Sequence, residues 1–560
     1  MQMKYIKKFI PILFILSLVL AACSTANESK ESTTDSNKNP DATTEEKVVR
    51  LSAAGEIPGL DPTLADNDFS FNVINQVFEG LYRLDKNGEP QLALAAEEPE
   101  VTEDGKVLTF KLRDDALWSD GSPVTAYDFE YSWKKVVDPD TGAAYGPQLE
   151  EIVTNATEIL VGEMSVDELG VEALDDKTLK VTLESPVPFF KELLTTATFM
   201  PQKQEFVEAQ GDQYATDSEH TLFNGPFVLS DWTSTDLSWN YEKNDQYWDK
   251  EAVNVDRIEV NVVKDTETAV NLYLSGQLDR VELTSDNVQQ FQGEDEFATT
   301  LTGAVTYLKM NQGKDGETTD LANLNIRKAL NMVIDKQVIV DELLNDGSIV
   351  ANANVPKGLA ENPETGEDFR AENGNLTEYN PEKGIAHWEK GLDELGRTEL
   401  EFELISSDSS ASKQLAENLK YQMESNLPGL TINIRNLSPK ASIAANVGQD
   451  YELIITGWGG DYQDPLTYLN LFITDSPGNH TGYSDSEYDK LVLGSKSDLT
   501  YHPEERWQAL LKAERMLIEE NAVLIPLYQK GVSYMQKDNI NDFITYPVSS
   551  DNYKWIDIVE

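Results

Sequence analysis

The sequence predicts a mixed architecture of the α/β or α+β type, in which at least part of the sheet is parallel. Strand-like and helix-like segments are interleaved along the chain, which excludes a β-sandwich and a helical bundle. Towards the carboxyl end the alternation becomes regular, with strand patterns at 400–405, 430–434 and 453–455 and a helix pattern at 411–425. Such alternation is typical of βαβ units, whose strands are parallel.

The other elements are predicted from local patterns. The first half of the chain has strand patterns at 48–54, 107–113, 178–183 and 255–263, and helix patterns at 71–81, 125–137 and 269–274. The hairpin turn before residue 107 is indicated by Glu-Asp-Gly-Lys at 103–106. Thr125 and Asp128 have the spacing of a capping box, which predicts a helix start at Thr125.

The second half continues with two consecutive helices over 326–344. Residues 354–381 are rich in Gly, Pro, Asn and Glu, a composition that predicts a long surface loop. Pro503 stands at the favoured first position of a helix, and residues 522–528 predict a last buried strand. The folded part shows no internal repeat.

Length and charge limit the classes of function. A chain of 560 residues suggests three or four structural units, at roughly 100 to 200 residues each. The 45 Lys and Arg residues against 99 Asp and Glu residues give a formal net charge of -54. This charge argues against nucleic-acid binding and against electrostatic docking on anionic lipid. With so many acidic residues, pairs of carboxylates do not indicate catalysis.

The amino terminus predicts export and lipid anchoring. Residues 1–22 have a basic start and a short apolar run, as signal peptides do. Leu-Ala-Ala-Cys at 20–23 resembles the lipobox of bacterial lipoproteins, and Cys23 is the only cysteine in the chain. Lipidation of Cys23, followed by a disordered tether to residue 46, would hold the protein on the membrane; an ordinary export signal is the alternative.

The segment Tyr451–Pro465 is the strongest candidate for a binding site. Its apolar strand ends in Gly457, Gly459 and Gly460, where backbone can approach a ligand closely. The loop presents the aromatic ring of Trp458 and the carboxylate of Asp461 at the carboxyl end of a strand. Such a pair suits an ammonium group. The alternative is that Trp458 belongs to the core and Asp461 caps the following turn.

Searches for catalytic motifs favour a binding protein over an enzyme. The sequence has no GxSxG, HExxH or Walker motif, and its four histidines are widely separated. No catalytic residue, metal ligand or cofactor is therefore predicted.

Residues 110–133 resemble the signature segment of extracellular solute-binding proteins of the peptide and nickel class. The matching residues are Arg113, Trp118-Ser119-Asp120-Gly121, Pro123-Val124-Thr125-Ala126 and Asp128-Phe129. Further similarity lies at 77–81, 169–176, 244–249 and 457–465. Within this class the chain is most similar to oligopeptide-binding lipoproteins that feed an ATP-driven (ABC) importer.

The resemblance implies a two-lobed periplasmic-binding-protein-like fold of class II, with a hinge between the lobes. The core of lobe 1 would comprise 47–82, 223–303 and 528–560, with an extra subdomain at 83–222, and lobe 2 would comprise 304–527. It also implies a monomeric receptor on the extracytoplasmic face of the membrane, which captures oligopeptides and delivers them to permease subunits.

The resemblance also implies the residues that contact the ligand. Asp461 would form an ion pair with the α-amino group of the peptide, and Trp458 would form a wall of a side-chain pocket. Gly457 and Gly459 would let the peptide approach the loop, and the peptide would add as a strand through its backbone. Further candidates for the cleft lining, from the same resemblance, are Ser70, Phe71, Asn72 and Tyr307.

Two positions depart from the pattern of the class. Relatives that select short peptides hold the carboxyl terminus with Arg and His, and the matching positions here are Ile455 and Ser412. This difference predicts that longer peptides are accepted. The alternatives within the class are a dipeptide, a signalling peptide or nickel, the last disfavoured by the few histidines; an exported peptidase is a further alternative.

Overall fold

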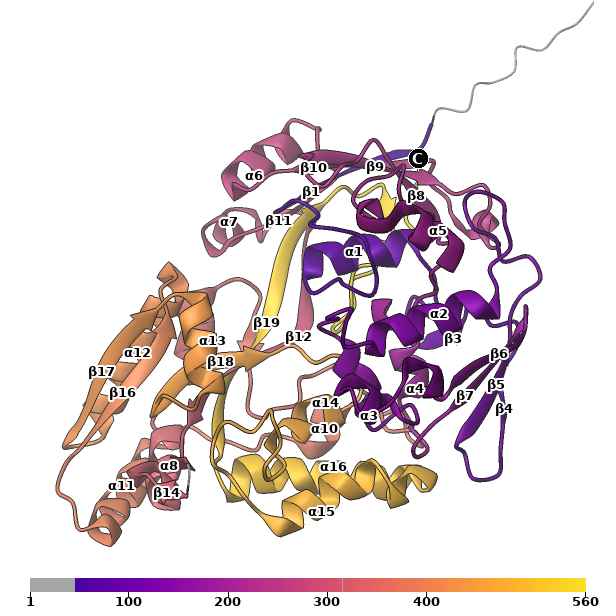
Figure 1. The fold of residues 1–560 in the computed structure, drawn as a ribbon. Coiled ribbons are helices and arrows are strands. Elements are labelled where there is room, and N and C mark those ends of the chain that lie inside the picture. The colour runs from indigo at the N-terminus through magenta and orange to yellow at the C-terminus, as the bar shows by residue number, and fades with distance from the viewer. Residues whose placement is uncertain (1–45, 315, 560) are drawn as a thin grey trace, which may run out of the picture. The chain divides into compact units, whose positions relative to one another are not determined.

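The computed structural model describes residues 46–314 and 316–559. The predicted signal peptide, Cys23 and nearly all of the predicted tether lie outside these residues. Three sheets of four or more strands, together with the helices packed on them, make up the described part (Figure 1). The fold is mixed α/β, as the interleaved patterns predict.

The first sheet has four strands in the order β1 (Val48–Ala53), β10 (Arg257–Val262), β9 (Ser238–Lys243) and β8 (Phe227–Ser230). Its first pair is parallel and the other two are antiparallel. Helix α1 (Asp68–Val77) begins where the Asn67 side chain accepts a hydrogen bond from the Ser70 N–H. It ends four residues before the predicted end because Phe78 is extended, which directs Glu79 into the core.

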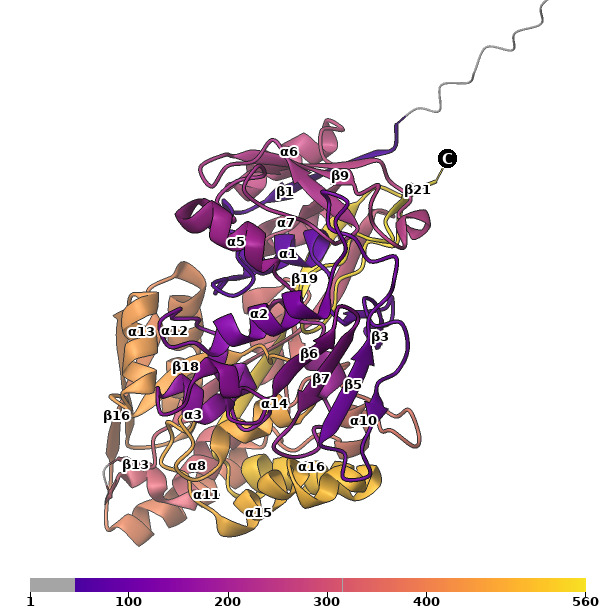
Figure 2. The same ribbon diagram turned by 45° about the vertical axis from the view of Figure 1, so that its right-hand side comes forward.

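The second sheet is antiparallel and lies within residues 100–182. Its order is β4 (Glu100–Val101), β5 (Val107–Lys111), β7 (Thr178–Thr182) and β6 (Val171–Asp175). Helix α2 (Ala126–Val137) packs beside it, as Figure 2 shows. The Asp128 carboxylate accepts a hydrogen bond from the Thr125 N–H at 2.8 Å, which confirms the predicted capping box.

The third sheet has seven strands and contains the predicted βαβ units. Its order is β11 (Arg280–Glu282), β19 (Leu524–Gln536), β12 (Phe297–Met310), β18 (Leu453–Trp458), β16 (Leu400–Ser407) and β17 (Leu430–Leu437), with β15 (Ile349–Val350) paired to β19. Strand β16 is parallel to both β17 and β18, which confirms the predicted parallel strands. Helices α12 (Ser410–Asn426) and α13 (Pro439–Val447) make the crossovers.

Strands β12 and β19 form a long antiparallel pair (Figure 1). The pair links two separate apolar cores. At one end Met535 packs in the core around α6 (Thr266–Leu274), and at the other Leu308 and Ile525 pack in the core under α12. The pairing register shifts between Leu301 and Val305 and again after Thr306, so the ladder is irregular near its middle. These two strands are the natural place for a bend.

The remaining elements are shorter or lie at the periphery. The helices are α3 (Ala156–Leu160), α4 (Phe190–Leu193), α5 (Gln204–Gln210), α7 (Ser285–Phe291), α8 (Leu324–Met332), α9 (Lys336–Val338), α10 (Phe369–Asn373), α11 (Pro381–Leu395), α14 (Leu466–Leu469), α15 (Ser486–Ser495) and α16 (Pro503–Arg515). Two-stranded pairs are formed by β2 (Tyr82–Leu84) with β3 (Pro90–Leu92), β13 (Gly313–Lys314) with β14 (Glu317–Thr318), and β20 (Ile540–Asn541) with β21 (Asp557–Ile558).

The prediction of a surface loop over 354–381 is wrong for much of that segment. Val355 and Phe369 are completely buried. The segment is held by Glu514 of α16, whose carboxylate accepts hydrogen bonds from the Val355 N–H at 2.7 Å, from Arg370 at 2.8 Å and from Asn373 at 2.7 Å. The buried Glu514 carboxylate accepts hydrogen bonds from the polar groups of this segment. The segment can therefore pack inside the fold although its sequence is polar.

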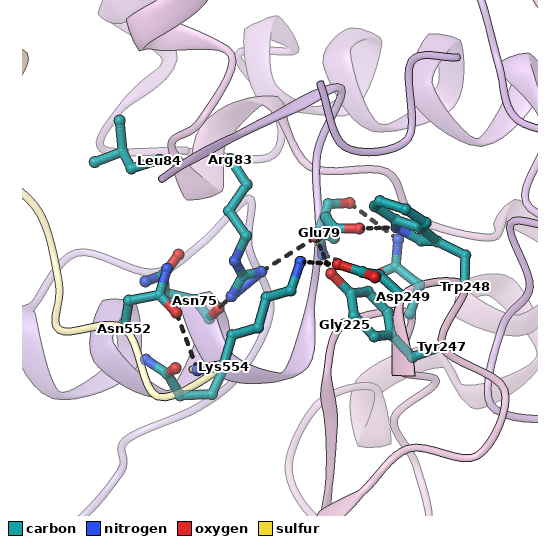
Figure 3. Close-up of polar contacts among 12 residues, drawn as sticks. Asn75, Glu79, Arg83, Leu84, Gly225, Tyr247, Trp248, Asp249, Asn552 and Lys554 are labelled. Carbon is teal, nitrogen blue, oxygen red and sulfur yellow. Dashed lines mark hydrogen bonds and ion pairs between the residues drawn. The ribbon is translucent and has the colours of Figure 1, made fainter. Parts of the chain in front are cut away.

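Two sequence segments that resemble the solute-binding class meet in the interior of the described structure (Figure 3). The Glu79 carboxylate, which is buried, accepts hydrogen bonds from the Tyr247 hydroxyl and the Trp248 indole, each at 2.6 Å. Arg83 lies 3.5 Å from the same carboxylate, and the buried Lys554 lies 2.7 Å from Asp249. This cluster joins the turn after α1, the loop after β9 and the carboxyl-terminal segment.

Among the described residues, no helix combines the length and the apolar character needed to cross a lipid bilayer.

Candidate functional site

The candidate loop begins at the end of β18, inside the seven-stranded sheet. Leu453 and Ile454 are fully buried, as predicted for this strand. Gly457 lies opposite Thr306 of β12, and a Cβ atom there would lie 2.8 Å from the Val305 carbonyl oxygen. Glycine is therefore required at 457 by the close approach of the neighbouring strand, and the chain leaves the sheet after Trp458.

Asp461 lies on this loop and is exposed to solvent. Its backbone N–H donates a hydrogen bond to the Thr467 hydroxyl at 3.0 Å, which fixes the loop over the start of α14. The protein surrounds the carboxyl on several sides, and this burial raises its pKa, which the Thr467 hydroxyl partly offsets. The carboxyl thus faces solvent from a confined position, where a ligand ammonium group would be favourable.

Two adjoining cavities share the Asp461 side chain. The smaller has a volume of about 420 Å³ and the larger of about 500 Å³. Tyr145, Gln148 and Tyr462 also line both. Asp461 therefore stands at the junction of a single continuous cleft, whose walls come from the loop after α2, from α4 and from the loop after β18.

The structure brings most of the predicted site residues to this cleft. Trp458 lines the smaller cavity, and Phe71, Asn72 and Gly459 line the larger.

Three predicted site residues line neither cavity. Ser70 is buried and donates a hydrogen bond from its hydroxyl to the Gly59 carbonyl at 2.7 Å, so it supports the first turn of α1. Gly457 is packed against β12, and Tyr307 of β12 is 2 % exposed. Contact of these three residues with a ligand stays a prediction.

Several cleft residues were not predicted from the sequence. Tyr145 packs edge-on against Phe71, with ring centroids 5.1 Å apart. Tyr462 stacks on Phe189 at 4.4 Å, with ring planes 2° apart. Tyr462 could have been proposed, since it follows Asp461 directly. The only sequence signal near Tyr145 is the neighbouring Gly and Pro residues, which indicate a loop but not a binding site.

A buried ion pair supports the candidate loop from behind. The Asp464 carboxylate accepts two hydrogen bonds from the Arg506 guanidinium of α16, at 2.8 and 2.9 Å. Arg506 also donates to the Ser495 carbonyl at 2.8 Å, and Asp464 accepts from the Leu466 N–H at 2.9 Å. Bidentate pairing of this kind fixes orientation as well as distance. The position of Asp461 therefore depends on α16.

Replacing Arg506 with Lys is expected to reduce the free energy of unfolding by about 1.5–3 kcal/mol, because the charge is retained while a charge-assisted hydrogen bond of the fork is lost. Urea unfolding followed by tryptophan fluorescence measures this loss. The matched control is Arg397→Lys, since Arg397 is exposed and lies 3.5 Å from Asp320. Equal stability of the two variants would show that the fork does not support the loop.

The charges of the cleft are unbalanced. Of the described residues that line the two cavities, Lys496 is the only basic one, and it pairs with Glu151 at 3.0 Å. Ile455 and Ser412, the positions expected to lack a carboxylate clamp, line neither cavity.

No group of three or more potential metal ligands in the described part of the chain is placed to hold a metal ion.

Comparison with known proteins identifies the family to which the chain belongs. Residues 89–480 match the family model described as bacterial extracellular solute-binding proteins, family 5 Middle. The chain is 36% identical to the dipeptide-binding protein of Lactococcus lactis subsp. cremoris, over 80% of this chain and 82% of that protein.

Two solved structures share the fold over 92% of this chain. Listeria monocytogenes OppA bound to peptide is 40% identical with a TM-score of 0.75, and all of its chain is covered. The substrate-binding domain of an oligopeptide ABC transporter from Bacillus anthracis is 38% identical with a TM-score of 0.76, with 99% of its chain covered. The fold is thus that of periplasmic binding proteins, as predicted. The chain belongs to the bacterial extracellular solute-binding proteins of family 5, a family of binding proteins and not of enzymes.

Proposed function

We propose that this protein is the peptide receptor of an ABC importer, held on the extracytoplasmic face of the membrane by a lipid on Cys23. Support for the ligand comes from the Listeria relative, whose structure is bound to peptide, and support for the importer comes from the Bacillus anthracis relative. Support for the anchor comes from the lipobox-like residues 20–23. The importer's permease subunits would be its protein partners.

The observation that carries this proposal is the position of Asp461. Its carboxylate stands where two cavities meet, and the Thr467 hydroxyl holds its backbone. The α-ammonium group of a peptide is a compact cation that such a carboxylate would pair with. With its amino group at Asp461, a peptide could direct side chains into both cavities, and the Trp458 and Tyr462 rings would form apolar walls.

Charge favours peptides longer than two residues. A dipeptide holds its carboxylate within about 7 Å of its amino group, since an extended chain spans at most about 3.3–3.6 Å per residue. Among the described residues that line the two cavities at Asp461, the only cation is Lys496, which Glu151 already pairs. The carboxylate of a dipeptide would therefore lack a partner there. A dipeptide receptor remains the second candidate, because the Lactococcus lactis relative is named as one.

We further propose that ligand binding closes two lobes, with the core of lobe 1 at 47–82, 223–303 and 528–560, the extra subdomain at 83–222 and lobe 2 at 304–527. Support comes from β12 and β19, which cross between the two proposed lobes and have an irregular register near their middle. The second sheet lies wholly within the proposed subdomain.

Native mass spectrometry against a pool of peptides two to eight residues long tests the proposal. Free peptides of three or more residues are expected to be retained, and their N-acetylated counterparts to be lost, because acetylation removes the ammonium group. Bound peptides are expected to be recovered intact. Retention of both forms would contradict the role of Asp461, cleavage would indicate a peptidase, and no retained peptide would refute peptide binding.

A further inference from the structure

The larger cavity is lined by carboxyl groups without any basic partner among its lining residues. Its acidic residues are Asp68, Glu192, Glu282, Asp461 and Asp551, and none of the described residues that line it is Lys, Arg or His. The rest of its wall mixes apolar side chains with uncharged polar ones, among them Thr195, Thr196, Asn72 and Asn75. Asp461 is assigned above to the terminal amine, so the other carboxyls need a separate explanation.

Glu192 on α4 is the least satisfied of these groups. Its Oε2 atom is closed to solvent and has no hydrogen-bond partner in the described chain. Burial raises the pKa of the carboxyl to about 7, and the negative charges of Asp464 and Glu89 add to this rise. The nearby cations are engaged elsewhere: Arg506 by Asp464, and Lys191 by Glu98 at 2.7 Å.

Asp551 is held rigidly at the same cavity. Its backbone carbonyl accepts hydrogen bonds from the side chains of Asn75 at 2.9 Å and Gln76 at 2.7 Å. Burial raises the pKa of its carboxyl to about 6, although the charge of Arg280 opposes the rise. The Arg280 guanidinium stacks over the Tyr534 ring at 3.5 Å and donates to Gln536 at 2.8 Å, and it does not line the cavity.

We propose that the larger cavity receives a cationic side chain of the bound peptide, Lys or Arg, with the carboxylates of Glu192 and Asp551 as its counter-charges. This inference rests on the proposed peptide-binding function and adds a side-chain preference to it. An acidic side chain would be repelled by the same carboxylates. An apolar side chain would leave the carboxylates of the cavity without a counter-charge while removing water from them, which costs free energy.

The test compares Lys with norleucine, which has the same straight alkyl chain without the ammonium group. Peptides with one substitution at each position in turn are titrated by calorimetry. At one position Lys is expected to bind about ten- to hundredfold more tightly than norleucine, the range for a hydrogen bond to a charged group. Glu192→Gln and Asp551→Asn are each expected to reduce this ratio.

The matched control is Glu242→Gln. Glu242 is a half-buried carboxyl on β9 whose pKa is also raised by burial, and it lines neither cavity. The variant is expected to keep the ratio of the wild-type protein. Equal binding of Lys and norleucine at every position would overturn the inference and leave peptide binding intact. Absence of binding by every peptide would instead contradict the proposed function.

Proton release gives a second readout. Near pH 7 the Glu192 carboxyl is partly protonated, and a neighbouring cation lowers its pKa, so binding of the Lys peptide releases protons. Calorimetry in two buffers of different ionisation enthalpy measures this release. Release is expected to be greater for the Lys peptide than for the norleucine peptide, and the difference is expected to shrink in Glu192→Gln. An identical release for both peptides would contradict the role of Glu192.

Folding of the variant is checked separately. The folded-state pKa of Glu192 lies above the ordinary value of 4.5, so its stabilising contribution is present at low pH and is lost as the pH rises towards 7. The ligand-free Glu192→Gln protein is therefore expected to be at least as stable as the wild-type protein at pH 8. A lower ratio of Lys to norleucine binding then cannot result from unfolding.

Discussion

Asp461→Asn is expected to weaken the binding of peptides with a free amino terminus by about 30-fold to several thousandfold. This range corresponds to about 2–5 kcal/mol, the cost of truncating one partner of a desolvated charge pair at an interface. Asn retains the size of the side chain and the backbone hydrogen bond to Thr467, which is made by the N–H of residue 461. The loss would therefore report on charge and not on the shape of the loop.

The pH dependence of binding provides an independent check. In the ligand-free protein, burial raises the pKa of Asp461, and an ammonium group beside it would lower that pKa. Binding must then remove a proton at low pH, so affinity is expected to fall as the pH drops through the pKa of the free protein. Calorimetric titration measures this fall, which should be weaker in Asp461→Asn.

The control for Asp461→Asn is Asp212→Asn, an exposed position outside the cleft with the same change in net charge. It is expected to bind as the wild-type protein does. If Asp461→Asn bound free and acetylated peptides as tightly as the wild-type protein binds free ones, another group would have to hold the amino terminus.

Glu79→Ala is expected to reduce the free energy of unfolding by about 3–5 kcal/mol, the range for removing one partner from a buried ionic cluster. The change leaves the Tyr247 hydroxyl and the Trp248 indole without an acceptor (Figure 3). It also leaves Arg83, which is 4 % exposed, without its carboxylate. Urea unfolding followed by tryptophan fluorescence measures the effect, and Trp248 itself lies at the altered site.

The control for Glu79→Ala is Glu172→Ala. Glu172 pairs with Lys180 at 3.3 Å on the surface, where the median contribution of an ion pair is about 0–1 kcal/mol. A loss of less than about 1 kcal/mol for Glu79→Ala would show that the cluster adds no more than a surface pair does.

The sequence predicts best where a local pattern is sufficient. The capping box at Thr125 and the glycine-rich end of β18 depend on a few consecutive residues, and both are present in the structure. Asp461 could therefore be proposed as a cleft residue. Glu192 and Asp551 could not, because they reach the cavity from distant segments whose neighbouring residues carry no pattern for a cleft.

The errors in the fold prediction also result from contacts between segments that are distant in the sequence. Strand β19 continues to Gln536, well beyond the predicted end at residue 528. Its polar residues Gln529 and Ser533 are buried because they bond to segments far away in the sequence, such as Lys357 and Asp346. Local hydrophobicity cannot reveal that a polar side chain will find a partner, and the same holds for the buried segment around Phe369.

The carboxyl-terminal segment affects the order in which the chain can fold. The Asp551 carbonyl and the Tyr553 N–H bond to Asn75 and Gln76 of α1, and β19 lies between β11 and β12 in the seven-stranded sheet. During synthesis from the amino terminus, α1 therefore lacks this packing until residues 551–553 have emerged. Contacts so distant in sequence make folding slow and expose apolar surface meanwhile. The native packing around α1 is thus expected to form only after these residues have emerged, a delay that would keep the chain compatible with export.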